Sequence, residues 1–597
     1  MTQIIYILIA FNFSQAAKMS WKILFFLVAW QHGCHSETVN MKLLQHWDTN
    51  WEGQFSVPLQ SNVLGWELKI NFSVPVSSIQ QWDGEWIVKG DNGGKYYVLL
   101  NKVDKGYHAA GSTLKIRMMG KFTGSTAPTA TAEFIDLTGD TQTVPPIHIP
   151  TGQQQTDYNY EEVLVKSLLF YEAQRSGKLP ADNRIPWRGN SALGDKGANG
   201  EDLTGGYYDA GDHVKFNFPM AYTTTMLAWG YLEWQDAYTK SGQHQQILDA
   251  IKWPLDYFLK CHVAPHELYV QVGDGGQDHG FWGRPEDMTM ARPAFKITES
   301  KPGSDVAGET AAAMAAGYLV FKHINATYAN ILLTHAKQLY EFATQFKGKY
   351  SDSVNQAAAY YRSADYQDEL GWAAAWLYEA TGESQYLADA EANRVSGAGW
   401  GDSWDDKTTY TNVLLYKLTK KDIYKTDVEA TFTDWMPGGS LPYTPGGMAY
   451  RLQWGALRYT VNMGLAAMMA ADAGLHAKEY RCWAMSQIHY ALGDNPNHHS
   501  FVVGFGANAP ARPHHRSSSC PSMPAPCGWD EQKNPGPNPH TLYGALVGGP
   551  GKSDEYKDDR NDYVKNEVAC DYNAAWQSAM AGLIHLALHN ELPTDCP

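Results

Sequence analysis

Two clusters of acidic residues, far apart in the chain, carry the side chains best suited to acid–base chemistry. One is Gly205-Gly-Tyr-Tyr-Asp209-Ala-Gly-Asp212-His213, and the other runs from Tyr556 to Ala574. Hydrolysis of a sugar acetal needs one protonated carboxyl group to release the leaving oxygen and one ionised carboxylate to activate water. Tyrosines stand beside the acids in both clusters. The clusters therefore indicate a carbohydrate-cleaving site, with a solvated acidic surface as the alternative.

The second cluster resembles the acid-bearing signature of glycoside hydrolase family 9, the inverting cellulases. Its aromatic, Asp, aromatic, Glu and Asn-small positions are filled by Tyr556, Asp558, Tyr563, Glu567, Asn573 and Ala574. The family's other signature is present as Gly493-Asp-Asn-Pro, Gly504-Phe-Gly-Ala-Asn and Pro513-His514-His515-Arg516. The first cluster matches the family's Asp-Ala-Gly-Asp motif. These separated motifs follow the family's order, and the resemblance covers roughly residues 157–590.

The resemblance implies a role for each acidic residue. Glu567 matches the general acid and Asp212 the general base, while Asp209 would hold the same water. Inverting hydrolysis places the two carboxyl groups roughly 6.5–9.5 Å apart, which leaves room for that water. Neighbouring carboxylates and a sequestered cleft would raise the pKa of Glu567 and keep it protonated. Asp558 is expected to orient the loop that carries the second signature.

Further positions match residues that bind substrate in this family. His514 and Arg516 are expected to donate hydrogen bonds to sugar hydroxyls in the −1 subsite, although a solvated turn is the alternative. Softer matches to cleft residues, with core positions as the alternative, are His279, Trp282, Trp400, Trp454 and Tyr572. The expected substrates are cellulose and soluble β-1,4-glucans.

A calcium loop found in some family members has a counterpart here. The matching positions are Ala364, Asp365, Asp368, Glu369 and Asp405. Oxygen donors of this kind suit Ca²⁺. Ala364 and Asp365 stand where those members have Ser and Gly, so one side-chain donor is missing. Any Ca²⁺ would be structural, since the chemistry needs no cofactor.

Residues 37–138 have the alternating pattern of a β-sandwich. Trp51, Trp66 and Trp82 resemble positions of a family 2 carbohydrate-binding module. The resemblance makes Trp51 and Trp82 flat platforms for cellulose and Trp66 a core residue, whereas the alternative places all three in the core. A third platform ring is missing near Tyr107, which leaves affinity for crystalline cellulose open.

Composition narrows the class of protein further. The chain has 597 residues, enough for two or three domains, and 44% of them are hydrophobic. Its 21 Trp and 35 Tyr exceed what a core requires, which favours exposed rings that bind sugars. A net charge of −16 argues against nucleic acid and anionic membranes as partners. A monomer that acts on a neutral polysaccharide fits these features.

The N-terminus predicts secretion. Lys22 followed by Ile23–Trp30 reads as a signal peptide within residues 1–36, and Met19 could be the true start. A signal anchor is the alternative. Removal of this segment leaves six cysteines, of which Cys520 and Cys527 flank a Pro-rich loop and are the expected disulfide pair. Free buried thiols remain an alternative for the others.

The remaining chain reads as a linker and a large helical domain. Residues 139–156 are rich in Pro, Gln and Thr, which predicts an extended linker. Over residues 157–592, helical spacing alternates with long loops. Apolar spacing predicts helices at Glu161–Ser176, Tyr222–Lys240, His244–Cys261, Val306–Phe321, Ala326–Phe346, Tyr366–Thr381 and Val461–Ala473. The resemblance implies an (α/α)6 barrel. The expected activity is that of an endo-β-1,4-glucanase. A non-enzymatic polysaccharide-binding protein is the alternative, as are processive or exo action and specificity for mixed-linkage glucan or xylan.

Overall fold

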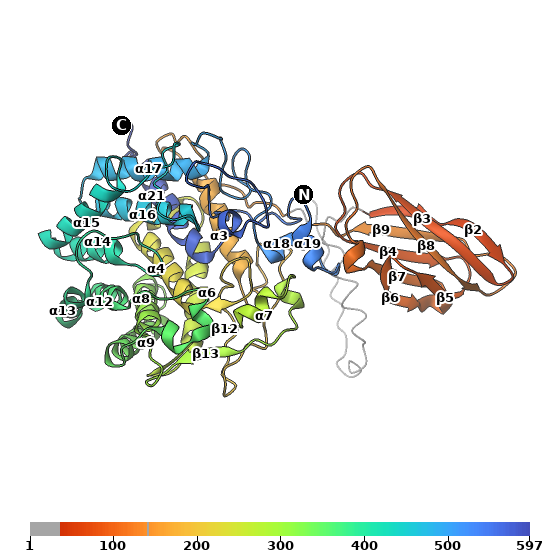
Figure 1. Ribbon diagram of the computed structural model, residues 1–597, viewed down its shortest axis with the longest axis horizontal. Coiled ribbons are helices and arrows are strands. Elements are labelled where there is room, and N and C mark those ends of the chain that lie inside the picture. Colours follow the sequence, from red (N-terminus) through yellow and green to blue (C-terminus); the bar gives the residue numbers. More distant parts are fainter. Residues whose placement is uncertain (1–35, 140–141, 597) are drawn as a thin grey trace, which may run out of the picture. The chain divides into compact units, whose positions relative to one another are not determined.

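The computed structural model describes residues 36–139 and 142–596, which form a β unit and a helical unit (Figure 1). The predicted signal peptide and both candidate start residues lie outside the described residues, apart from Ser36, which opens the first strand. Among the helices described, none is both long and apolar enough to cross a bilayer.

The β unit consists of two antiparallel sheets, as the alternating pattern predicts. One sheet has the order β1 (Ser36–Asn40), β9 (Ala130–Asp136), β4 (Trp66–Phe72), β7 (Tyr96–Asn101) and β6 (Gly84–Gly90). The other has the order β2 (Lys42–Trp47), β3 (Asn50–Pro58), β8 (Thr113–Phe122) and β5 (Val76–Gln81). Side chains from both sheets, among them Phe55, Leu68 and Ile116, enter one shared core. This packing defines a sandwich.

The helical unit is a double ring of helices. The inner ring consists of α4 (Asn217–Glu233), α8 (Ser304–Phe321), α12 (Gln367–Thr381), α14 (Thr408–Thr419), α16 (Ala456–Asp472) and α21 (Cys570–His589). Each of these helices packs against the next, and α21 closes the ring on α4. The outer ring consists of α3 (Tyr160–Gln174), α6 (His244–Cys261), α9 (Ala326–Gln345), α13 (Ser384–Asn393), α15 (Asp422–Trp435) and α17 (Ala477–Leu492). Outer and inner helices alternate along the chain, which confirms the predicted (α/α)6 barrel.

Small residues let the inner helices fit the crowded centre. In α8, the stretch Ala311–Ala316 is completely buried, and so is nearly every other residue of that helix. A helix that is apolar all round is buried all round, because no polar face is available for solvent. The predicted helix Tyr222–Lys240 is in fact two helices, α4 and α5 (Gln235–Lys240), which break at Trp234.

Long loops between the helices carry the predicted site. The segment between α3 and α4 contains Asp209 and Asp212, and the segment between α17 and α21 contains His514 and Glu567. Functional residues on loops over a rigid scaffold are the common arrangement in enzymes.

Hydrogen bonds hold much of the predicted linker to the helical unit. Residues 142–156 have no helix or strand, yet the Gln154 amide donates to the Ala587 carbonyl at 2.8 Å. The side chain of Gln154 also accepts from the Leu592 amide at 3.1 Å. At the other end, Gln142 Oε1 accepts from Trp187 Nε1 at 3.0 Å, so the segment is held to the helical unit at Gln142 and at Gln154.

Two disulfides are present in the helical unit. The predicted Cys520–Cys527 bond is confirmed, and a second bond joins Cys482 to Cys596. Cys261 and Cys570 are free and buried, which fits the alternative of buried thiols.

Candidate active site

The predicted motifs converge around Gly211. The Gly211 carbonyl accepts from the Arg516 amide at 3.1 Å, and His514 pairs with Glu567 as a short parallel bridge. The Cys570 amide donates to the Asp209 carbonyl at 2.8 Å. A Cβ atom at position 211 would lie 2.1 Å from the His514 carbonyl oxygen. Glycine is therefore required there by close approach of two backbones, which brings both acidic clusters together.

Glu567 has the protonation state that a general acid needs. Burial raises its pKa to about 7, with the Asp212 charge raising it further and two hydrogen bonds opposing the shift. These bonds come from Trp454 Nε1 at 2.9 Å and from the Tyr572 hydroxyl at 3.2 Å, and both end on Oε2. Near neutral pH a large fraction of Glu567 thus carries a proton.

The paired aspartates differ in charge. Burial alone would raise the pKa of Asp212, but the neighbouring His279 ring and the Arg516 charge hold it below its usual range. Burial and the Asp212 charge raise the pKa of Asp209 well above its usual range. Asp209 accepts a hydrogen bond from the Tyr361 hydroxyl at 2.5 Å. The pair therefore carries its negative charge on Asp212, as a water-activating base requires.

A buried ion pair between Arg516 and Asp278 stabilises the charge on Asp212. Arg516 is only 5% exposed, and its Nη1 binds the carboxylate and the carbonyl oxygen of Asp278. His279 Nε2 lies 3.7 Å from Asp212 Oδ2, and the nearby Asp212 carboxylate raises the pKa of His279. The Arg516 guanidinium thus positions Asp278 and stabilises the charge on Asp212, and its predicted contact with a sugar hydroxyl stays a prediction.

His514 is poised to accept a hydrogen bond rather than to donate one. Burial lowers its pKa to about 4, so the ring is neutral. Its Nδ1 lies 2.7 Å from the Arg560 carbonyl oxygen, which can only accept. The proton is therefore on Nδ1, and Nε2 presents a lone pair. This corrects the expectation that His514 donates to a sugar hydroxyl.

The aromatic rings matched to cleft residues divide into two groups, and the alternative of a core position holds for one of them. Trp400 and Trp454 are exposed, as a sugar platform requires. Trp282 and Tyr572 are buried: the Trp282 ring meets the His514 ring edge-on at 5.5 Å, and Tyr572 donates to Glu567. The latter two therefore position catalytic side chains and are not stacking surfaces.

Asp558 holds the loop of the second signature. Its carboxylate accepts from the Ala511 amide at 2.9 Å and from the Arg512 amide at 3.0 Å. Those residues lead directly into His514, so the contact is the loop-orienting one that the motif predicts.

Sequence reasoning missed two supporting residues. Tyr361 fixes Asp209, and Asp278 links Arg516 to the aspartate loop through the His213 amide at 3.2 Å. Asp278 directly precedes the predicted cleft residue His279, and this position in the sequence could have indicated its role. Tyr361 comes to Asp209 only through the fold, so nothing in its local sequence indicated the contact.

The predicted calcium loop has three carboxyl groups, those of Asp368, Glu369 and Asp405. Burial raises the pKa of Asp405 to about 7, and burial also raises the pKa of Asp368. Glu369 Oε1 forms an ion pair with Lys407 Nζ at 2.8 Å, whereas its buried Oε2 has no hydrogen-bond partner.

The carboxylates would hold a structural Ca²⁺, although the Ala364 amide already donates to Asp405 at 2.9 Å. Asp365 caps its own chain by accepting from the Tyr366 amide at 2.7 Å. Calcium binding stays a prediction.

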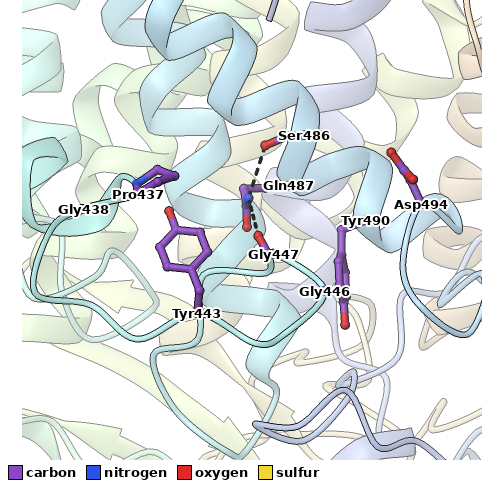
Figure 2. A pocket seen from close by; sticks show the side chains of 9 residues that line it. All are labelled: Pro437, Gly438, Tyr443, Gly446, Gly447, Ser486, Gln487, Tyr490 and Asp494. Carbon is purple, nitrogen blue, oxygen red and sulfur yellow. Dashed lines mark hydrogen bonds between the residues drawn. The ribbon is translucent and has the colours of Figure 1, made fainter. Parts of the chain in front are cut away.

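An open hollow of about 590 Å³ lies elsewhere in the helical unit (Figure 2). It lies between α17 and the loop around Gly447, and its Gln487 amide is occupied by the Gly447 carbonyl at 3.0 Å. The Tyr490 hydroxyl is likewise held by Asp554 at 2.5 Å. Asp494 is the one carboxylate among its lining residues. Without a carboxyl pair, this hollow cannot perform the predicted chemistry.

In the β unit, the predicted sugar platform needs correction. Trp66 is buried as expected, but Trp51 is 0% exposed and belongs to the same core. Trp82 is 53% exposed, and Trp47, at the end of β2, is 47% exposed. The prediction for Trp51 is therefore wrong, because its alternate position on β3 faces the opposite sheet. Trp47 is the exposed ring that sequence reasoning missed.

The helical unit is thus an (α/α)6 barrel whose loops bring together Glu567, a carboxyl group with a raised pKa, and Asp212, a carboxyl group with a lowered pKa. The chain belongs to glycosyl hydrolase family 9, whose family model matches residues 160–580.

Two endoglucanases are similar to this chain over 446 and 453 residues. The chain is 50% identical over 446 residues to endoglucanase B of Cellulomonas fimi, which covers 72% of this chain and 42% of that protein. It is 48% identical over 453 residues to endoglucanase A of Bacillus pumilus, covering 73% of this chain and 68% of that protein. The chain thus spans less than half the length of the first relative.

Solved structures agree in fold. The endoglucanase from the termite Nasutitermes takasagoensis is 54% identical, with a TM-score of 0.70, and the match covers 72% of this chain and 100% of that one. Endoglucanase CelQ from Clostridium thermocellum, complexed with cellotetraose, is 39% identical with a TM-score of 0.65, covering 74% and 72%. Both proteins share sequence as well as fold with this chain, at 54% and 39% identity.

Proposed function

We propose that this protein is an endo-β-1,4-glucanase that cleaves internal bonds of cellulose and soluble β-1,4-glucans with inversion at the anomeric carbon. The observation that carries the proposal is the opposite protonation of two carboxyl groups in one site. The pKa of Glu567 is raised to about 7 by burial, whereas His279 and Arg516 hold the pKa of Asp212 below its usual range. The relatives' names, endoglucanase A and B, supply the substrate class.

The proposed reaction uses both groups in one step. Glu567 donates its proton to the glycosidic oxygen while Asp212 accepts a proton from the attacking water. Attack from the face opposite the leaving group inverts the configuration, so the new reducing end is the α-anomer. Afterwards Glu567 is ionised and Asp212 protonated, and exchange with solvent restores the resting state. Asp209, being neutral, helps to hold the water without competing for its proton.

Sugar binding is assigned to the groups that face solvent. Trp400 and Trp454 stack against glucosyl rings through apolar burial. Trp400 is braced on one side by the Arg451 guanidinium, 4.2 Å from the ring centre, and by the edge of Tyr459. His514 Nε2 accepts from a sugar hydroxyl. A platform with one face supported leaves the other face for the glucan.

The β unit is proposed to be a carbohydrate-binding module that uses Trp47 and Trp82. The segment 1–36 is proposed to direct secretion, which agrees with the two disulfides of the helical unit because such bonds persist in oxidising compartments.

Two assays on the purified chain test the reaction. Viscosity of carboxymethylcellulose should fall much faster than reducing ends appear, because internal cuts shorten chains with few new ends. Proton NMR of fresh cello-oligosaccharide product should show the α-anomer first. A parallel rise of reducing ends and viscosity loss would point to exo action, and a β-anomer first would refute inversion.

A further inference from the structure

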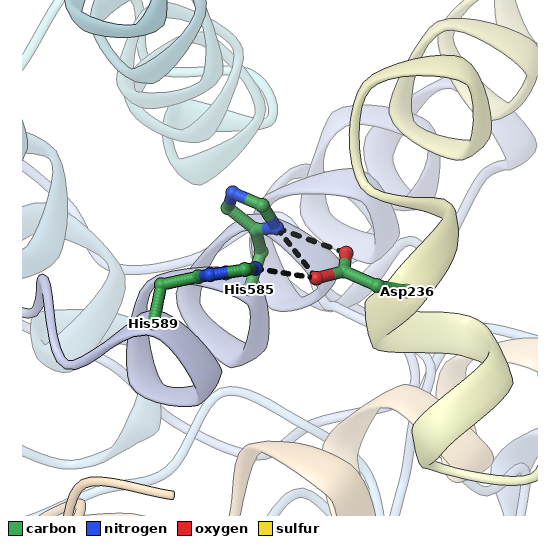
Figure 3. A group of neighbouring side chains, drawn as sticks. All are labelled: Asp236, His585 and His589. Atoms are coloured by element: carbon green, nitrogen blue, oxygen red, sulfur yellow. Dashed lines mark hydrogen bonds and ion pairs between the residues drawn. The ribbon is translucent and has the colours of Figure 1, made fainter.

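Two histidines of α21 and an aspartate of α5 form a cluster outside the catalytic site (Figure 3). His585 Nδ1 lies 2.9 and 3.0 Å from the two oxygens of Asp236, and His589 Nε2 lies 2.8 Å from Oδ2. The two imidazole rings are 4.4 Å apart. Both rings thus direct a nitrogen at the same carboxylate.

The positions of these side chains follow from the helices that carry them. His585 and His589 are one turn apart on α21, and residues four apart lie on the same helix face. Asp236 stands in the first turn of α5, where its Oδ1 also accepts from the Ala237 amide at 2.9 Å. Because α5 packs against α21, the three donors are held by two rigid elements rather than by a loop.

We propose that Asp236, His585 and His589 bind one Zn²⁺ ion. Zinc takes imidazole nitrogen and carboxylate oxygen in a tetrahedral arrangement, and three protein ligands leave the fourth position to water. The donor atoms all lie within 4.8 Å of one another, and the cluster is open to solvent on the His589 side. Ca²⁺ and Mg²⁺ are disfavoured because they prefer oxygen ligands.

Ion binding exchanges hydrogen bonds for coordination bonds. Without the ion, a ring N–H of each histidine donates to the Asp236 carboxylate. Zn²⁺ needs the lone pairs of those same nitrogens, so the hydrogen moves to Nε2 of His585 and to Nδ1 of His589. No proton is gained or lost by a neutral ring. Zinc–ligand bonds of about 2.0–2.1 Å set tetrahedral donor separations of roughly 3.3 Å, so each histidine nitrogen needs to move only a few tenths of an ångström away from the Asp236 oxygen.

The ion would tie the ends of two helices far from the chemistry. Along α21, His585 lies about 20 Å from Tyr572, which contacts Glu567, at 1.5 Å rise per residue. The chain beyond α21 is already fastened to α17 by the Cys482–Cys596 disulfide. A zinc ion would add a link from the last turns of α21 to α5. We therefore expect it to affect stability and not turnover.

Equilibrium dialysis of the full chain against ZnCl₂, in Ca²⁺-containing buffer, tests the site. A His585→Gln/His589→Gln variant should bind one fewer equivalent of Zn²⁺ than wild type, and His589→Gln alone should bind at least ~10-fold more weakly. The number of Zn²⁺ ions bound is compared with wild type because a second possible metal cluster exists. It is formed by Asp212, Asp278 and His279, and the variants leave it intact. His323→Gln, at an exposed histidine outside both clusters, is the matched control.

A spectroscopic readout checks the ligands themselves. Co²⁺ in place of Zn²⁺ should give the intense visible absorption of a four-coordinate ion in wild type and in His323→Gln. The double variant should lack the part of that signal due to this site, while its circular dichroism and melting temperature without metal match wild type. Equal Zn²⁺ stoichiometry in wild type and double variant would overturn the proposal, as would failure of wild type to bind Zn²⁺.

Discussion

The hydrogen bond from Trp454 Nε1 to Glu567 predicts that removing this donor shifts the alkaline limb of the pH–activity profile. Trp454→Phe keeps an aromatic face for sugar and removes the Nε1 donor that lies 2.9 Å from Oε2. That bond opposes the burial that raises the Glu567 pKa to about 7, so its loss raises this pKa further. A more basic general acid stays protonated to higher pH, and the alkaline limb therefore moves upward.

The size of the shift follows from the exposure of the donor. A hydrogen bond to a charged group contributes about 1.5–3 kcal/mol, and one pKa unit corresponds to about 1.4 kcal/mol. Trp454 is exposed, so water replaces part of the lost bond, and the lower end of this range applies. The Tyr572 hydroxyl still donates to Oε2. We expect a shift of about one pH unit.

The assay is the pH profile of kcat/KM on a soluble cello-oligosaccharide, because its limbs report ionisations of the free enzyme. Trp400→Phe is the matched control, since Trp400 is an equally exposed ring with no bond to Glu567. An alkaline limb in Trp454→Phe that coincides with those of wild type and Trp400→Phe would refute the reasoning.

Three further predictions follow from the same geometry. Asp212→Asn should lower kcat by ~10²–10⁴-fold, whereas Asp209→Asn should cost less because Asp209 is already neutral; equal losses in both would contradict the assigned charges. Gly211→Ala should lower kcat/KM by ~10²-fold because its Cβ meets the His514 carbonyl, while Gly194→Ala, which meets nothing, should match wild type. Trp47→Ala and Trp82→Ala should each weaken pull-down on cellulose without unfolding the β unit. Trp51→Ala should instead destabilise that unit by about 3–5 kcal/mol in urea titrations, and normal stability would show that Trp51 is not core.

Much of the barrel could be predicted from sequence, but unevenly. Outer helices such as α6 and α9 expose one face and bury the other, so their apolar spacing was visible. Spacing also predicted the inner helices α4, α8, α12 and α16, although α4 begins at a buried Asn217 that no spacing reveals. The outer helices α13, α15 and α17 and the inner helices α14 and α21 were not predicted, so a polar face was not the deciding signal.

The proposed catalytic acids could be singled out from sequence because their motifs are local. Their partners could not, because Tyr361 and Asp209 meet only after the barrel closes. Burial also changes what two predicted residues do. Tyr572 donates a hydrogen bond to Glu567 instead of facing the sugar. His514 presents a lone pair on Nε2 because its Nδ1 hydrogen is bonded to the Arg560 carbonyl oxygen. Sequence indicates which groups are present, whereas the fold decides which atom of each group faces the substrate.

The most direct test of the central claim is the dependence of Glu567→Gln on the leaving group. The amide keeps the shape of the side chain but has no proton to transfer, so hydrolysis of cellotetraose should fall by at least ~10³-fold. A dinitrophenyl β-cellobioside needs no protonation of its leaving group and should be cleaved at a rate close to that of wild type. Asp212→Asn should lose activity on both substrates. Equal loss of both activities in Glu567→Gln would contradict its assignment as the general acid.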